Sequence, residues 1–182
     1  MICAFEGWND AGDAATMSLD HLLDQWTAEP LATIECEEFF DFTSTRPMVE
    51  LLEDDRRTVR WPDTHLHVAQ VDGAPDLILL RGHEPQLRWK TFCAQVIEVA
   101  RHYDARLVMT LGALLADVPH SRPTSVYGTA YEQNVIDALH LERSRYEGPT
   151  GIVGALHDEC RRAGLNSASL WAAVPSLSLI HI

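Results

Sequence analysis

The chain has 182 residues, of which 46% are hydrophobic and 23% are charged, a composition typical of one globular domain rather than of a disordered segment. Its 14 basic and 27 acidic residues give a formal net charge of −13, which opposes binding to nucleic acid and to anionic membranes. No apolar stretch approaches the ~20 residues that span a bilayer, and the first residues lack the layout of a signal peptide, so we expect a cytoplasmic protein.

The chain opens with a short apolar run that breaks into a polar turn. A buried strand over 2–5 leads into a turn with acids, an amide, a tryptophan and two glycines, and a helix follows. Open α/β sheets keep their binding crevice at the carboxyl ends of strands. We therefore expect Glu6, Asn9 and Asp10 to lie beside such a crevice. Because so little chain precedes this strand, we also expect the sequence to be cut at its start.

Helices and strands alternate through the first half. Apolar residues recur at helical spacing before Pro30, and short β-like runs follow, ended by Pro62 and by the Asp72-Gly73 turn. At least two of these runs are close enough to pair as an antiparallel hairpin or meander. In chain order, we expect a helix over 14–26, a strand over 31–36, a loop over 43–47, β-like runs over 57–61, 65–71 and 77–81, and a helix over 88–103.

The second half continues the alternation but contains a long polar segment. Residues 113–129 are too polar and proline-rich for a core element, so we expect a long loop after a strand that ends at Gly112. The other expected elements are a strand over 106–111, helices over 131–140 and 152–163, a turn over 148–151, and a strand over 167–174. This order predicts one three-layer α/β domain with a mixed sheet.

Residue patterns give no indication of a cofactor or a metal. The four cysteines, at 3, 36, 93 and 160, are scattered and sit mostly in apolar segments, so we expect buried, reduced thiols. His65 and His67 share one face of a strand but have no third ligand at a matching spacing. Phosphate-loop, dinucleotide-binding and nucleophile-elbow motifs are absent from the sequence. We therefore expect no bound cofactor and no metal.

Polar residues follow predicted strand ends at three places: the opening turn, the turn over 82–88, and the loop over 113–129. If the strands run parallel there, the three clusters converge on one edge of the sheet. A carboxylate could then act as a general base or bind a ribose hydroxyl, an arginine could hold an anion, and a histidine could transfer protons. The candidate crevice residues are Glu6, Asn9, Asp10, Glu84, Arg88, Asp117, His120 and Arg122.

The same residues also have a purely structural interpretation. Asn9 and Asp13 could cap the following helix, the arginines could form ion pairs with neighbouring acids, and His120 could simply be exposed. Capping carboxylates and catalytic carboxylates look alike in sequence. Residue chemistry alone therefore leaves both interpretations open.

Six short motifs occur in one order between about residue 2 and residue 175. They are FEGWNDAGDAA (5–15), FFDFT with RP (39–47), LRGHEP with RW (80–89), LGALLADVPH with RP (111–123), YEGPTGI (146–152) and WAAVP (171–175). Together they resemble the actinobacterial branch of the proteasome assembly chaperone 2 family. The resemblance implies a three-layer α/β/α fold with a mixed central sheet, similar to the purine nucleoside phosphorylase type.

The resemblance also implies a function. Eukaryotic members help to assemble the proteasome α-ring, and archaeal relatives bind proteasomes. We therefore expect a protein-interaction or assembly-chaperone-like factor with proteasome-related partners. Whether the chain forms a homo-oligomer stays open. In binding members a C-terminal hydrophobic-Tyr-any tripeptide docks into the proteasome. This chain ends in LIHI, without tyrosine, so that mode does not carry over. The alternative is a binder of nucleoside-type or anionic small molecules, or an enzyme, with a phosphorylase-like crevice.

The end of the sequence departs from the family. After Val174 and Pro175, members usually continue with a His-Tyr pair and a helical region, whereas this chain reads SLSLIHI. We interpret residues 176–182 as a non-native tail that follows a single, incomplete domain over 1–175. Loss of a helical region would expose apolar faces, and we expect poor solubility as a result.

Overall fold

The structure, a computed structural model, describes residues 1–176. Eight strands form one sheet in the order β2-β5-β6-β1-β7-β10-β8-β9, and β3 and β4 pair separately. The strands are β1 (Ile2–Glu6), β2 (Glu29–Ile34), β3 (Met48–Leu51), β4 (Arg57–Arg60), β5 (Thr64–Ala69), β6 (Leu77–His83), β7 (Val108–Ala116), β8 (Val126–Ala130), β9 (Glu142–Arg143) and β10 (Ser167–Pro175). The helices are α1 (Ala14–Gln25), α2 (Trp89–His102), α3 (Gln133–Leu139) and α4 (Ile152–Arg162), with a short 3-10 turn at Ala11–Asp13.

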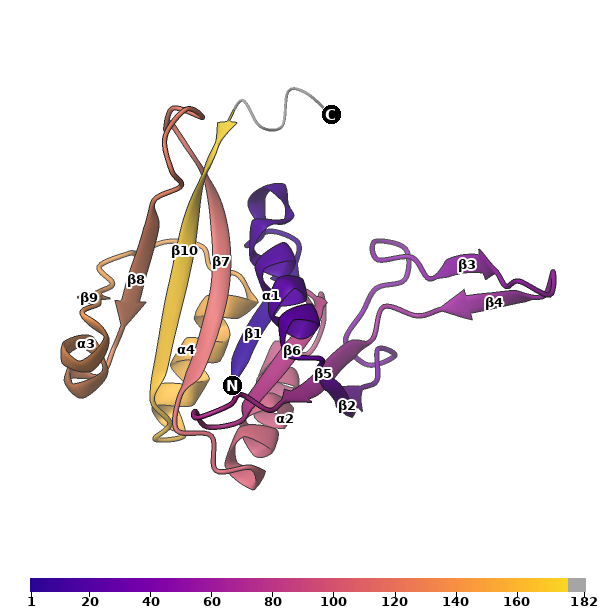
Figure 1. Cartoon of the computed structure of the whole chain (residues 1–182), viewed down its shortest axis with the longest axis horizontal. Helices are drawn as coiled ribbons and strands as arrows, with labels where there is room; N and C mark the ends of the chain where they lie inside the picture. Colours follow the sequence, from indigo (N-terminus) through magenta and orange to yellow (C-terminus); the bar gives the residue numbers. More distant parts are fainter. Residues whose placement is uncertain (177–182) are drawn as a thin grey trace.

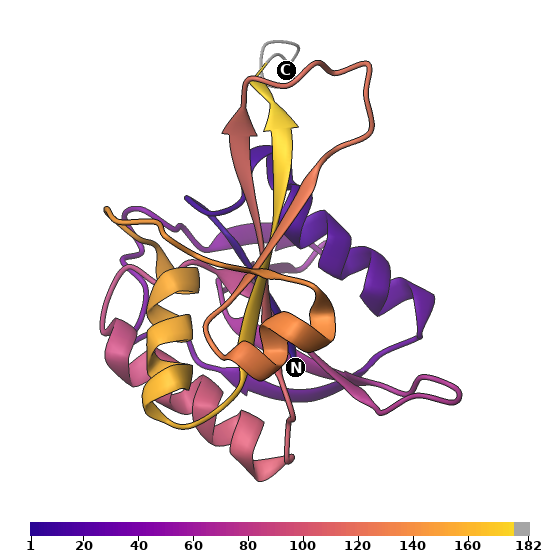
Figure 2. The same cartoon turned by 90° about the vertical axis from the view of Figure 1, so that its left-hand side faces the viewer.

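The sheet is mixed and lies between helices, as the order of elements predicts. Strands β6, β1, β7 and β10 run parallel in the centre, whereas β5 is antiparallel to β6 and β8 is antiparallel to β10. Helix α1 covers one face, and α2 and α4 cover the other (Figures 1 and 2). The expected three-layer α/β/α fold and the antiparallel hairpin of β5 and β6 are therefore confirmed. No helix of residues 1–176 is long and apolar enough to cross a membrane.

Strand β1 fixes the centre of the sheet because its side chains alternate between the two layers of helices. Cys3 and Phe5 pack with Phe92 of α2, where the two phenyl rings meet edge to face with centroids 5.9 Å apart. Ala4 faces the other way and packs against Leu19 of α1. Burying a side chain such as Phe5 or Phe92 contributes roughly 1.5–3 kcal/mol, so this strand is held firmly where the opening turn leaves it.

Strand β7 continues beyond Gly112, where the sequence predicts its end. All nine residues of β7 pair in parallel register with β10, and Gly112 lies opposite Trp171. A Cβ atom at Gly112 would come within 2.6 Å of the Trp171 ring, so glycine here makes room for an indole rather than ending a strand. The predicted loop over 113–129 was therefore too long: its first four residues belong to β7, and its last four belong to β8.

Strands β3 and β4 form a two-stranded arm, residues 48–60, that projects away from the body (Figure 1). Every residue of the arm is exposed. Val49 lies opposite Val59 in the register, and Leu51 is on the same face, whereas Glu50 and Arg60 form an ion pair of 2.6 Å on the opposite face. One face of the arm therefore carries Val49, Leu51 and Val59 with Arg57 at its edge, and the other carries the ion pair. Sequence reasoning identified β4 but missed β3.

The four cysteines are free and buried, as predicted. Burial is the main cause that raises the pKa of Cys3, Cys93 and Cys160 to about 12 and that of Cys36 to about 11. These thiols are therefore protonated at neutral pH and lack the thiolate that reacts with oxidants.

Candidate functional site

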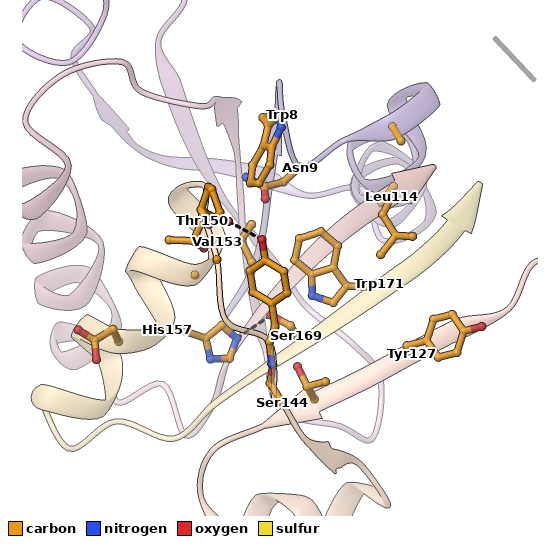
Figure 3. A pocket seen from close by; sticks show the side chains of 18 of the residues that line it. Trp8, Asn9, Leu114, Tyr127, Ser144, Thr150, Val153, His157, Ser169 and Trp171 are labelled. Atoms are coloured by element: carbon orange, nitrogen blue, oxygen red, sulfur yellow. Dashed lines mark hydrogen bonds between the residues drawn. The ribbon is translucent and has the colours of Figure 1, made fainter. Parts of the chain in front are cut away.

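A pocket of about 1070 Å³ opens at the carboxyl ends of β1 and β7 and over the first half of β10, beside the first turns of α4 (Figure 3). The opening turn, strand β8 and the segment before α4 complete its walls. Its lining is mostly apolar and aromatic. The lining residues include Trp8, Asn9, Leu114, Tyr127, Tyr131, Tyr146, Thr150, Val153, His157, Asp158, Arg161, Ser169 and Trp171.

Asp10, directly after Asn9 in the opening turn, caps helix α1. Its carboxylate is only 5% exposed, and it accepts hydrogen bonds from the Ala15 amide at 2.6 Å and from the Thr16 hydroxyl at 2.5 Å. These bonds satisfy donors that the first turn of a helix leaves free. The capping interpretation is thus correct in kind but names the wrong residues, because the Asp13 side chain makes no capping hydrogen bond and Asn9 binds Glu84 instead.

Glu84, the first residue after β6, joins three elements at the edge of the pocket. One carboxylate oxygen accepts from the Ile152 amide at 2.8 Å and from Asn9 Nδ2 at 3.1 Å, and the other accepts from the Trp8 amide at 3.3 Å. A negative charge at the first amide of α4 is favoured by the helix dipole. A Cβ atom at Gly151 would lie 2.0 Å from Asn9 Nδ2, so only glycine allows this close approach.

This junction fixes the orientation of the Asn9 side chain. A carboxylate can only accept hydrogen bonds, so the Asn9 amide nitrogen must face Glu84 and the amide oxygen must face away from it. Figure 3 shows that oxygen pointing into the pocket. Asn9 is only 4% exposed, and its Oδ1 atom makes no hydrogen bond to any described residue. The pocket therefore contains an acceptor to which no described residue donates.

A chain of hydroxyls and one imidazole forms the polar floor of the pocket. His157 Nε2 lies 2.7 Å from Ser169 Oγ, His157 Nδ1 lies 2.9 Å from Ser167 Oγ, and Ser169 Oγ lies 2.6 Å from Thr110 Oγ1. Burial is the largest cause that lowers the pKa of His157, so its ring is neutral at pH 7. A neutral ring can donate through one nitrogen and accept through the other, which satisfies both serines.

Aromatic side chains form further walls. The Trp171 indole lies over Gly112 of β7 and faces the pocket (Figure 3). Tyr146 also lines the pocket, and its hydroxyl donates to the Pro149 carbonyl at 2.8 Å. The Arg161 guanidinium lies 5.1 Å from the centre of the Tyr131 ring and also pairs with Asp158 at 2.7 Å. The charged residues of this wall are therefore already partnered.

The other acidic and basic candidates of the first two clusters form ion pairs outside the pocket. Glu6 binds Arg81 at 2.8 Å and His83 Nδ1 at 2.9 Å. The hydrogen bond from His83 is the largest cause that lowers the pKa of Glu6 to about 2, and the charge of Arg81 adds to it. Arg88 pairs with the exposed Glu38 at 2.7 Å. Arg88 therefore forms an ion pair with a neighbouring acid, as the structural interpretation of the sequence expects.

The third cluster lies apart from the other two. Asp117, His120 and Arg122 are exposed on the loop between β7 and β8, which extends beyond the body of the sheet (Figure 2). They do not line the pocket, because the four extra residues of β7 carry the loop past it. The structure thus brings Asn9 and Glu84 into direct contact at the edge of the pocket, which Asn9 lines, whereas the neighbouring Asp10 bonds to the start of α1. Among residues 1–176, no His, Cys, Asp and Glu side chains gather in a group of three or more that could hold a metal.

Sequence reasoning missed the residues that form most of the pocket. His157, Ser169 and Trp171 lie in a predicted helix and a predicted strand, where a serine or histidine reads as ordinary packing. The motifs YEGPTGI and WAAVP are the sequence features that point to this pocket, since the lining residues Tyr146, Thr150 and Trp171 belong to them. In the sequence, both motifs support the family resemblance and predict no site.

Known proteins match the chain at the levels of sequence and fold. A sequence model of the PAC2 family matches residues 4–178. A solved PAC2 family protein from Streptomyces avermitilis is 46% identical, with a TM-score of 0.91, and the match covers 96% of this chain and 75% of that one. A proteasome-assembly chaperone homologue of Mycobacterium tuberculosis is 40% identical, with a TM-score of 0.88, over 97% of this chain and 75% of that one.

A more distant likeness concerns the fold alone. Pyrococcus furiosus PbaA, an archaeal homologue of proteasome-assembly chaperone, is 15% identical, with a TM-score of 0.66, over 96% of this chain and 71% of that one. No protein with a curated description matches the chain.

Proposed function

Because this chain belongs to the PAC2 family, we propose that it is a protein-interaction factor that assists proteasome assembly. The observation that carries the proposal is the 40% identity with the mycobacterial proteasome-assembly chaperone homologue over 97% of this chain. Four unpaired cysteines are compatible with work in the reducing cytoplasm, where an assembly factor would meet newly made subunits.

The arm supports an interaction function on physical grounds. A two-stranded hairpin that packs on nothing is only marginally stable in water. Val49, Leu51 and Val59 are exposed by 63%, 66% and 47%, and they share one face of this hairpin. Exposed apolar clusters rimmed by charge are typical of protein-binding surfaces. We propose that this face of the arm contacts a proteasome α subunit.

The test is affinity capture of proteasome subunits from the source organism, followed by binding measurements with purified α subunit. In the arm variant, Val49, Leu51 and Val59 are each replaced by serine, and we expect binding to weaken at least ten-fold. The matched control replaces Glu50 and Arg60, the ion pair on the opposite face, by alanine and should bind as the wild type does. Absence of α subunits from the captured material, together with no binding of purified α subunit, would refute the proposed function. Normal binding by the serine variant would refute the role of the arm alone.

A further inference from the structure

We propose that the pocket beside α4 binds a small, neutral, planar nitrogen heterocycle that donates an amino or N–H hydrogen to Asn9 Oδ1. This site is separate from the arm, so the inference does not rest on the proposed role in proteasome assembly. Such crevices at the carboxyl ends of parallel strands are common ligand sites in open α/β sheets.

The unpaired oxygen of Asn9 indicates which group the ligand must carry. The Asn9 side chain is nine-tenths buried, its nitrogen is bound to Glu84 Oε1 at 3.1 Å, and its oxygen points into the pocket (Figure 3). Because rotation of the amide would place its oxygen against the Glu84 carboxylate, Asn9 keeps its nitrogen on Glu84 and presents its oxygen as an acceptor to the pocket. Because no described residue donates to this oxygen, a ligand that carries an N–H group can form a hydrogen bond with it inside the pocket.

The walls indicate the shape of the ligand. Trp8 and Trp171 lie on either side of the space in front of Asn9 (Figure 3), and Tyr146 also lines the pocket, so that three rings offer flat apolar surfaces. Planar heterocycles stack on such rings, and this interaction tolerates many ring types because each has a π-face. A volume of about 1070 Å³ accommodates such a ring together with a substituent.

The charges indicate that the ligand is neutral. Asp158 and Arg161 are the charged residues among the described lining, and they pair with each other at 2.7 Å. His157 is neutral, and both of its ring nitrogens already face serine hydroxyls. Among the described lining residues, no charged group is thus left to balance a phosphate or an ammonium group.

A matched pair of probes tests the acceptor. 9-Methyladenine carries an amino group, whereas 9-methylpurine has the same rings and no N–H donor at all. We expect ligand-observed NMR and calorimetry to detect binding of 9-methyladenine, 9-methylguanine or 1-methylcytosine with a Kd below about 1 mM. If 9-methyladenine is among the binders, 9-methylpurine should bind at least ten-fold more weakly than it does. Failure of all three amino heterocycles to bind would overturn the proposal, as would equal binding of 9-methyladenine and 9-methylpurine.

Matched variants test the location. Asn9→Ala should abolish the preference for the amino group, provided that it retains a native thermal transition. Trp8→Ala is the second variant, because Trp8 is 65% exposed and its removal leaves the core intact. It should weaken binding at least five-fold, whereas Trp61→Ala, a tryptophan near the arm that does not line the pocket, should leave binding unchanged. Loss of binding with Trp61→Ala but not with Trp8→Ala would overturn the assignment of the site.

Discussion

Replacement of Glu84 tests the idea that one carboxylate holds the opening turn to helix α4. In Glu84→Ala, the Ile152 amide and Asn9 Nδ2 lose their acceptor in a partly buried place. Hydrogen bonds to a charged group contribute about 1.5–3 kcal/mol each at most, and the helix dipole contributes about 0.3–1 kcal/mol. Since water reaches part of the site, we expect the free energy of unfolding to fall by about 3 kcal/mol.

The conservative variant separates charge from shape. In Glu84→Gln, the amide oxygen can still accept from Ile152, but the new NH₂ group faces the Trp8 amide, which is also a donor. We expect a smaller loss of about 1–2 kcal/mol. The control is Glu38→Ala, which removes an exposed ion pair with Arg88 and should cost less than about 1 kcal/mol.

Urea unfolding followed by circular dichroism measures these differences, with thermal melts as a second readout. For a chain of this length, about 3 kcal/mol corresponds to a fall in Tm of roughly 6–12 °C. A Glu84→Ala protein within about 0.5 kcal/mol of the wild type, at an unchanged dependence on urea, would show that the carboxylate does not hold the junction. Equal losses of stability in the alanine and glutamine variants would show that the remaining amide oxygen of glutamine does not accept from Ile152 as expected.

Four further outcomes are expected. Gly112→Ala should lower the Tm and shift tryptophan fluorescence, because the added Cβ would press on the Trp171 ring; an unchanged Tm would contradict this packing. The pKa of Glu6 is lowered to about 2, so its ion pairs stabilise the fold above about pH 4.5 and are lost as the pH falls toward 2. Stability should therefore fall less steeply over that range in Glu6→Gln, and parallel pH profiles would speak against it. Because burial lowers the pKa of His157, its NMR titration should lie below the usual value of about 6.5, and a midpoint at or above it would refute the neutral ring. The four buried thiols should react with a disulfide reagent only as fast as the protein unfolds; rapid reaction in native buffer would contradict their burial.

The order of helices and strands was predictable because its signals are local. Apolar spacing gave α1, α2 and α4 within about two residues at each end, and the alternation gave the three layers. The length of β7 was not predictable in this way. Its last four residues are held in the sheet by residues of β10 that lie 59 positions further along the chain, and no local pattern records that pairing.

The candidate site was only partly predictable for a related reason. The position of the opening turn at the end of β1 follows from sequence, and so does the concentration of polar groups there. The role of each polar group depends on partners that are distant in sequence. Glu84 orients the side-chain amide of Asn9, and Gly151 allows α4 to approach it. Asp10 and Asn9 are neighbours with similar side chains, yet one caps a helix and the other faces a pocket. Sequence alone treated them as equivalent.

The place of β10 between β7 and β8 has a consequence for synthesis on the ribosome. About 45 residues separate the end of β8 from the end of β10, and at 5–20 residues per second they take roughly 2–9 s to translate. Throughout that interval β7 and β8 have no strand between them, and the backbone groups that β10 will bind stay unpaired. An open strand edge is a template for pairing with other chains. The interval before β10 emerges is therefore a stage of synthesis in which this molecule is prone to aggregate.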